Sequence, residues 1–204
     1  EMAYYGFELS EQLKSPILLR ITTRLAHSRS GVERLQQVNQ NEGSVPQNLR
    51  QFVLLPAIAR QNYNGLLSNQ VNMETAAEKS KYNKYVDADD KSLGIVACGI
   101  AYNYLMENYQ EENLKHPLLK ISQYPLPHKQ MDKMLEECDE VLVIEEGYPF
   151  VEQRLKGYQE KGTPIKGKYD GTLPRVGELT PNAVAEPLSL AVKEGQPAPT
   201  LIKN

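Results

Sequence analysis

A continuous apolar run, Leu93–Cys98, constrains the fold of this chain most, because it shows no alternation of polar and apolar residues. Such a run is typical of a strand that helices cover on both faces, as in a parallel sheet. Gly99 follows at once and permits a tight turn, since it has no side chain to clash. Ala101–Tyr109 then has the residue spacing of a helix. The sequence therefore predicts a strand–turn–helix unit in the middle of the chain.

Short apolar segments alternate with helix-like segments through the rest of this region. That alternation favours right-handed crossovers and a parallel sheet of about four strands. The fold class that we expect is therefore α/β, as a three-layer domain with a mostly parallel sheet over residues 91–170. After the strand–turn–helix segment, we expect strands at Leu118–Ser122, Val141–Ile144 and Pro164–Lys168, and helices at His128–Cys138 and Phe150–Gln159.

The beginning of the chain reads as the end of another domain. Glu1–Leu13 is expected to be a helix that ends before Pro16, since proline cannot continue it. Ile17–Ile21 is expected to be a short buried strand, and Thr22–Ser30 a polar loop at its carboxyl end. That edge is where ligands tend to bind in open α/β sheets. We therefore interpret residues 1–32 as an α–β remnant.

Residues 33–90 are predicted to link the two domains. Gln36–Gln47 is rich in Gln and Asn, a composition that suits a surface connection. Pro56 is well placed as the first residue of a helix, and the spacing of apolar residues predicts one long helix to about Tyr82. Lys79–Asp90 is charged and is expected to be solvated.

The end of the chain, residues 171–204, is expected to be a second linker, because it is rich in Pro and Gly. Thr180 and Pro181 can cap and begin a short helix toward Ala185. The chain starts inside what reads as a helix and ends in what reads as an open connection. We therefore expect it to be a piece of a longer polypeptide.

Composition and charge argue against several classes of protein. The net charge of −3 argues against a nucleic-acid or anionic-membrane binder. No apolar run approaches the ~18–20 residues that span a bilayer. Glu1–Leu9 has no basic start followed by an apolar stretch, as a secretory signal would have. The two cysteines are too few for a disulfide framework, and we expect a cytoplasmic protein with reduced thiols.

Two clusters of residues could carry chemistry. In Thr22–Arg29, Arg24 could bind a carboxylate through two hydrogen bonds, and His27 could move a proton near neutral pH. The alternative there is a solvated loop. Glu145 and Glu146 follow a buried strand and could act as acid–base groups or bind a basic residue of a partner. The simpler alternative, which we favour, is that one carboxylate caps the next helix and the other is solvated.

Metal and nucleotide sites are not expected. His27, His116 and His128 lie far apart in the sequence, and the chain has no Cys-x-x-Cys pair. A structural zinc site or an iron–sulfur cluster, which usually takes four thiolates, is therefore not expected within this chain. Gly94–Gly99 has the glycine spacing of a P-loop but lacks the Lys and Ser or Thr that hold phosphate and magnesium.

Five segments in the same order resemble the middle of the alpha subunits of indolepyruvate:ferredoxin oxidoreductases, in the thiamine-diphosphate-dependent 2-oxoacid oxidoreductase family. The similarity covers nearly the whole chain, and the conserved order makes it more specific than any single motif. The segments are Pro16–Ser30 (PILLRITTRLAHSRS), Leu93–Tyr104 (LGIVACGIAYNY), Tyr124–Pro127 (YPLP), Val141–Phe150 (VLVIEEGYPF) and Leu173–Pro181 (LPRVGELTP).

The resemblance implies a parent enzyme that decarboxylates aryl pyruvates with coenzyme A and passes electrons through [4Fe–4S] clusters to ferredoxin. Its cofactors would be thiamine diphosphate and Mg²⁺, and its partners a beta subunit and ferredoxin. Residues 1–32 would end the pyrimidine-binding domain, and residues 91–170 would form a transketolase C-terminal-like domain. Residues 171–204 would lead to a diphosphate-binding domain. Self-association is also expected, through the exposed strand edge at Ile17–Ile21.

The chain departs from the family where catalysis would need it. It has no Gly-Asp-Gly motif with a downstream Asn and no cluster cysteines. The resemblance therefore implies a structural module without catalytic residues or bound cofactors of its own. It places Arg24, His27 and Ser28 near the substrate end of the thiamine site of the whole enzyme. Alternatives are a different 2-oxoacid, such as pyruvate, or an independent ligand-binding or regulatory module.

Overall fold

The computed structural model describes residues 1–34, 36–37, 42–109, 114–158, 163–168, 170–174 and 179–191. The chain divides into a first unit, Glu1–Met73, and a second unit, Glu74–Asn204. Among the described residues, no helix combines the length and the apolar character that a membrane crossing requires.

The second unit is built on a five-stranded mixed sheet with the order β1-β3-β2-β4-β5. β2, β3, β4 and β5 run parallel to one another, as the sequence predicts, and β1 joins the edge antiparallel to β3. The α/β fold class with a mostly parallel sheet is therefore confirmed. The strands are β1 (Lys84–Val86), β2 (Gly94–Cys98), β3 (Leu118–Ile121), β4 (Val141–Ile144) and β5 (Ile165–Lys166).

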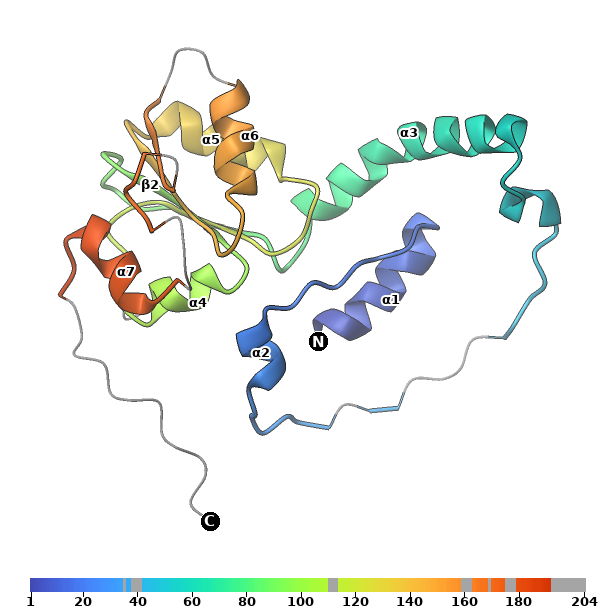
Figure 1. Ribbon diagram of the computed structural model, residues 1–204, viewed down its shortest axis with the longest axis horizontal. Helices are drawn as coiled ribbons and strands as arrows, with labels where there is room; N and C mark the ends of the chain where they lie inside the picture. Colours follow the sequence, from blue (N-terminus) through green and yellow to red (C-terminus); the bar gives the residue numbers. More distant parts are fainter. Residues whose placement is uncertain are drawn as a thin grey trace. The chain divides into compact units, whose positions relative to one another are not determined.

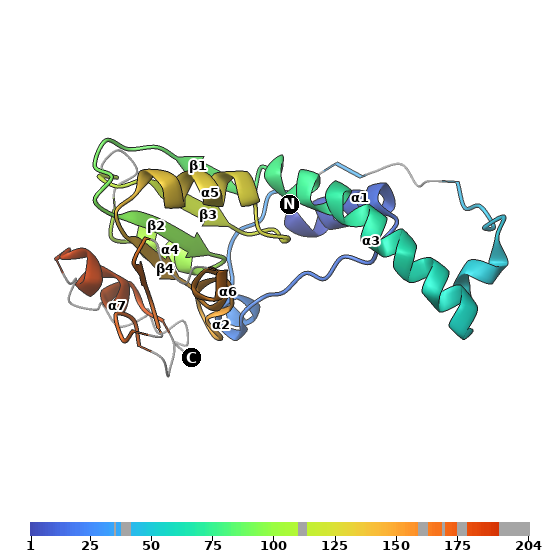
Figure 2. The ribbon, with the colours of Figure 1, turned by 90° about the horizontal axis from the view of Figure 1, so that it is seen from above.

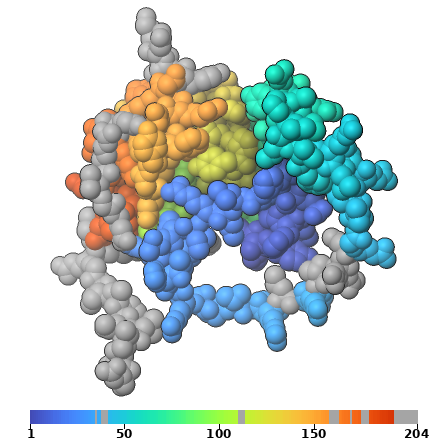
Figure 3. Space-filling model, turned by 45° about the vertical axis from the view of Figure 1, so that its right-hand side comes forward, coloured from blue at the N-terminus to red at the C-terminus, as the bar shows by residue number. Residues whose placement is uncertain are grey.

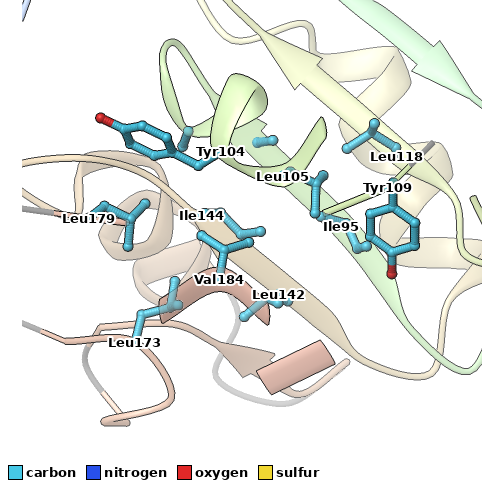
Figure 4. Close-up of a cluster of buried hydrophobic side chains, with 12 residues drawn as sticks. Ile95, Tyr104, Leu105, Tyr109, Leu118, Leu142, Ile144, Leu173, Leu179 and Val184 are labelled. Carbon is cyan, nitrogen blue, oxygen red and sulfur yellow. The ribbon is translucent and has the colours of Figure 1, made fainter. Parts of the chain in front are cut away.

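Helices cover both faces of this sheet, so the unit has three layers (Figures 1 and 2). On one face, α4 (Ala101–Met106) and α7 (Pro181–Ala185) pack over a buried cluster that includes Ile95, Leu142 and Ile144 (Figure 4). On the other face, α5 (His128–Glu137) and α6 (Phe150–Tyr158) pack over a second cluster. Side chains of each inner strand alternate between the two clusters, which explains why β2 and β4 are apolar throughout.

Glycine stands at positions 94 and 99 of the second unit for two different reasons. A Cβ on Gly94 would lie 2.2 Å from Sδ of Met134, so glycine lets α5 pack closely against β2. This packing, and not a phosphate cradle, explains the first glycine of Gly94–Gly99. Gly99 has φ +56 at the end of β2, a conformation that favours glycine and that makes the expected turn.

The connections change face at β2. The chain leaves β2 through α4 on one face to reach β3, and returns from β3 through α5 on the other face to reach β4. The carboxyl end of β2 is therefore the topological switch point of the sheet, where open α/β folds tend to bind ligands. The loops that meet there follow β2, β3 and β4.

The first unit contains α1 (Met2–Leu13), α2 (Thr23–His27), η1 (Leu49–Phe52) and most of α3 (Pro56–Glu78). α1 ends as predicted, with Lys14 in the left-handed conformation. Nδ2 of Asn69 on α3 donates a hydrogen bond to the carbonyl oxygen of Leu13 at 2.7 Å. The buried hydrophobic side chains that the structure describes in this unit are Leu9 and Leu13.

The predicted strand at Ile17–Ile21 is wrong. These residues are extended but pair with no strand, and Leu18 is 94% exposed. The segment after α1 lies on the surface (blue in Figure 3). A strand needs a hydrogen-bonded neighbour, and the described residues of the first unit supply none.

Three smaller expectations also need correction. The loop Thr22–Ser30 contains a short helix, α2, and the long helix ends at Glu78 instead of near Tyr82. Lys79–Asp90 is not solvated throughout, because it contains β1 and the buried Ser80 and Asn83. Residues 35 and 38–41 of the first expected linker lie outside the described residues, as do residues 175–178 and 192–204 of the second.

Candidate functional site

The switch point places Glu145 directly after β4, where it is only 4% exposed. Its Oε2 accepts a hydrogen bond from the N–H of Val151, and its Oε1 accepts one from the N–H of Glu152, both at 3.0 Å. These are free N–H groups at the start of α6, so the carboxylate satisfies donors that the helix itself cannot. Of the two roles that the sequence left open for Glu145, the structure supports the cap.

A buried ionic network surrounds this cap. The Lys168 ammonium donates to the carbonyl oxygen of Gly147 at 2.6 Å and is almost fully buried. The Glu152 side chain, also buried, accepts from the N–H of Lys168 at 2.7 Å and from Nζ of Lys156 at 2.9 Å. Together these bonds tie the ends of β4 and β5 to α6. Lys156 and Glu152 form an ion pair, whereas Glu145 and Lys168 bond backbone groups.

Burial changes the protonation behaviour of this network. It raises the pKa of Glu145, although the two backbone donors oppose the change. It lowers the pKa of Lys168, while the neighbouring carboxylates of Glu145, Glu146 and Glu152 act against that shift. Burial, together with the Glu145 charge, raises the pKa of Cys98 well above its ordinary value. Cys98 is therefore a protonated thiol at neutral pH and a poor nucleophile.

Glu145 serves the structure of the fold, whereas the next residue, Glu146, has one side-chain oxygen that no described group bonds. Both oxygens of Glu145 are used by backbone donors, so acid–base work on a substrate would break the cap of α6. Glu146 differs, because its Oε2 is buried and accepts no hydrogen bond from any described residue. Gly147 then turns the chain with φ 81, which presents Tyr148 and Phe150 to solvent.

The predicted substrate-proximal residues lie in the first unit. Arg24 and His27 are in α2 and Ser28 is its C-terminal cap, and all three are exposed. Thr22 Oγ1 accepts from the N–H of Leu25 at 3.3 Å, and Ser28 Oγ donates to the carbonyl oxygen of Leu25 at 2.7 Å. The structure thus brings the three residues together on one short helix. Their role toward a substrate stays a prediction.

The described side chains do not supply the ligands that the metal groups of the family would need. Among the described residues, no three His, Cys, Asp or Glu side chains are placed to hold a metal ion. The whole chain has two cysteines, Cys98 and Cys138, and both are buried in the hydrophobic cluster under α5 and α6. A [4Fe–4S] cluster takes four thiolates, so the thiols here are packing residues.

An acidic hollow of about 460 Å³ lies at the opposite, amino-terminal edge of the sheet, lined by Asp87–Asp90, Leu114 and Lys115. Hydrogen bonds from Lys91 and Lys133 lower the pKa of Asp87 to about 2. Lys91 also donates to Glu137 Oε2 at 3.0 Å. These contacts fix the loop before β2 to α5, so the acidic groups have a structural explanation.

Glu152 and Lys168 belong to no sequence motif, and the sequence alone does not predict their part in this network. A signal was present for Glu152: it follows Val151 and precedes Leu155 by three positions, on the apolar side of the expected helix. A Lys four residues later, at position 156, is the spacing of a helical ion pair. Lys168 offers no such pattern, since only the fold brings it to Gly147.

The fold is an α/β module in which a network of buried charged residues caps α6 at the carboxyl ends of β4 and β5. No family model matches the chain. Curated proteins do match it, and the chain is related to the IorA subunits of indolepyruvate oxidoreductases, which confirms the resemblance seen in the sequence. IorA of Methanothermobacter thermautotrophicus is 32% identical over 195 residues, covering 93% of this chain and 32% of that protein. IorA of Archaeoglobus fulgidus is 36% identical over 174 residues, covering 82% and 27%.

The chain therefore spans about a third of the length of the curated relatives that it matches. A solved 2-oxoglutarate:ferredoxin oxidoreductase from Magnetococcus marinus also aligns with it, at a TM-score of 0.45 and 16% identity. That alignment covers 67% of this chain and 24% of the other.

Proposed function

We propose that this chain is the central structural module of an indolepyruvate oxidoreductase alpha subunit. The observation that carries the proposal is the match to IorA subunits over 93% of this chain, within about a third of their length. The relatives are named oxidoreductases, and the described residues of this chain offer a closed structural network instead of a catalytic group. The reaction therefore takes place on residues outside this sequence.

The exposed apolar surface of the first unit supports the module role. Leu18, Leu54 and Phe7 are exposed by 94%, 87% and 78%, whereas only Leu9 and Leu13 are buried hydrophobic side chains among the described residues there. Burying each large apolar side chain stabilises a fold by roughly 1.5–3 kcal/mol. A surface of this kind marks an interface. We infer that further polypeptide of the enzyme covers it and pairs with Ile17–Ile21 as a strand.

The reaction, cofactors and domains that we propose for the whole enzyme follow from the resemblance of the sequence to this family. The whole enzyme would oxidatively decarboxylate aryl pyruvates with coenzyme A to aryl-acetyl-CoA and reduce ferredoxin. Thiamine diphosphate, Mg²⁺ and [4Fe–4S] clusters would be held by other domains of the alpha subunit, and a beta subunit would complete the enzyme. Residues 1–32 would close the pyrimidine-binding domain, and residues 91–170 would hold the cofactor-binding domains in register.

The test is an assay of the whole enzyme that contains this chain. Purified with its partner subunit, it should reduce ferredoxin with indolepyruvate only when coenzyme A is present. Pyruvate and 2-oxoglutarate, tested at equal concentrations, should give a lower kcat/KM. Failure to oxidise any 2-oxoacid would overturn the proposal, and a preference for pyruvate would move it to another substrate of the same family.

A binding experiment tests the module role separately. The 204-residue chain should show no change in Tm with thiamine diphosphate, coenzyme A or indolepyruvate, because a ligand that binds the folded state raises Tm. A strong rise with any of the three would instead favour an independent ligand-binding module.

A further inference from the structure

Apolar side chains stand exposed along the first part of α3, a helix of 23 residues. All residues from 59 to 68 are exposed, and Tyr63, Leu66, Leu67 and Val71 have exposures of 60%, 45%, 42% and 65%. A helix in a protein takes most of its stability from packing one face against another element. A row of uncovered apolar side chains on a helix of this length is therefore a candidate interface.

Two of these side chains, Tyr63 and Leu67, belong to a pattern that is typical of paired helices. Along this part of α3, five residues follow one another at alternating steps of four and three, an average of 3.5 residues. That spacing keeps side chains on the seam between two helices that pack along their length. We call the five residues the α3 stripe: Arg60, Tyr63, Leu67, Gln70 and Glu74.

α1 contacts a different side of α3. Nδ2 of Asn69 donates its hydrogen bond to the carbonyl oxygen of Leu13, at the end of α1. Successive helical residues are about 100° apart around the axis, so Asn69 lies about 160° from Leu67. The contact with α1 therefore leaves the α3 stripe open to a partner.

Opposite charges mark the two ends of the α3 stripe. Residues 61–73 contain no Lys, Arg, His, Asp or Glu. Arg60 lies seven residues before Leu67, and Glu74 lies seven residues after it, so each is about 10 Å along the axis from Leu67. The ion pairs among the described residues include neither Arg60 nor Glu74. Both charges are therefore available to a partner.

We propose that the α3 stripe packs antiparallel against the α3 stripe of a second copy of this chain. A twofold axis at Leu67 places Arg60 of each copy opposite Glu74 of the other, because both lie seven residues from the axis. A twofold interface uses the same surface on both copies, so it requires a self-complementary pattern of this kind. Parallel packing would instead bring like charges together. An unrelated partner would not require charges placed symmetrically about one residue.

The first test is sedimentation equilibrium of the 204-residue chain from low micromolar to millimolar concentration. The mass should rise from 23.1 kDa toward twice that value. Arg60→Glu and Glu74→Arg should each raise the dimer Kd about tenfold, because each turns two attractive pairs into repulsive ones. An equimolar mixture of the two variants should restore pairing, since every charge then meets its opposite. A chain that stays monomeric, or a mixture that associates no better than its components, would overturn the proposal.

The apolar centre is tested by Leu67→Glu, which should remove the dimer over the same concentrations because it places two carboxylates at the axis. Gln61→Glu is the matched control: it adds the same charge to an exposed position about 120° around the helix from Leu67, and it should leave Kd within about twofold. Far-ultraviolet circular dichroism shows whether α3 stays helical in each variant.

Self-association that persists unchanged in Leu67→Glu would overturn the proposal and would point to the exposed segment Ile17–Ile21 as the contact between copies. The charge variants decide the matter if Leu67→Glu loses helix content, because Arg60 and Glu74 contribute no described ion pair to the fold. The proposal does not depend on the enzyme activity proposed above, so the two can fail independently.

Discussion

The side-chain amide of Asn83 bonds both polar groups of the Gln123 backbone. Its Nδ2 donates to the carbonyl oxygen of Gln123 at 2.9 Å, and its Oδ1 accepts from the N–H of Gln123 at 2.9 Å. Oδ1 also accepts from the N–H of Ser122 at 2.8 Å, and Nδ2 donates to the carbonyl oxygen of Ala77 at 3.0 Å. One buried side chain thus joins the end of α3 to the loop that carries Tyr124.

Asn83→Ala should lower the free energy of unfolding by about 2–4 kcal/mol, because it removes these bonds and leaves buried backbone groups without partners. Urea denaturation of the purified chain measures the change. Asn72→Ala is the control, since Nδ2 of Asn72 makes one exposed bond to Asn69 Oδ1. Its effect should stay within about 0.5 kcal/mol. Equal effects of the two variants would mean that the hydrogen bonds of the Asn83 side chain add no stability.

One substitution should have opposite effects at two glycines. Gly94→Ala should destabilise the fold by about 1–3 kcal/mol, because the new Cβ would lie 2.2 Å from Sδ and 3.1 Å from Cγ of Met134. Gly65→Ala lies inside α3 with no atom within 4 Å of the new Cβ. It should stabilise by about 0.5–1 kcal/mol through helix propensity. Thermal unfolding of both variants tests the pair, and a stable Gly94→Ala would contradict the close packing of α5.

Glu145 should give the fold a pH dependence that glutamine lacks. Its pKa is raised in the folded state above the ordinary value of 4.5 by burial. The stability from this group is therefore fully present below the unfolded pKa and is lost as pH rises through the folded pKa. The Tm of the parent chain minus that of Glu145→Gln should fall from about pH 4 toward neutral pH. A difference that is constant over this range would contradict the assignment.

Asp87 should show the opposite sign. Hydrogen bonds from Lys91 and Lys133 lower its folded-state pKa from 3.8 to about 2. Its contribution is therefore present above the unfolded pKa and is lost as pH falls through the folded one. The Tm difference between the parent chain and Asp87→Asn should shrink as pH falls from about 4 toward 2. A difference that stays constant over this range would contradict the bonds from Lys91 and Lys133 to Asp87.

The central strands could be predicted from sequence because burial on both faces leaves a continuous apolar run, as in Gly94–Cys98 and Val141–Ile144. β1 could not, since this edge strand has three residues, of which Lys84 is exposed. The opposite error occurs at Ile17–Ile21, where the sequence predicts a strand that the structure does not form. Its composition suits a strand, but pairing depends on a neighbour that local sequence cannot reveal.

The candidate sites show the same limit. The sequence left two roles open for Glu145, and only the distances to Val151 and Glu152 decide for the cap. The helical spacing of Phe150, Val151, Leu155 and Tyr158 predicts that these side chains face inward. Val151 and Leu155 are buried, but Phe150 is 48% exposed, and the side chain of Tyr158 lies outside the described part of the chain. Phe150 is the first residue of α6, so its ring can turn outward and meet Tyr124.

Arg24→Ala, made in the whole alpha subunit with its partner, tests the predicted substrate-proximal residues. A carboxylate held by a guanidinium through two bonds loses them, so the apparent KM for the 2-oxoacid should rise about tenfold with little change in kcat. Arg29→Ala is the matched control, because Arg29 is an exposed arginine two residues beyond the end of α2. It should leave KM within about twofold. If the two variants have the same kinetics as the parent enzyme, α2 lies away from the substrate carboxylate, and Arg24 serves the helix end, where its charge offsets the dipole.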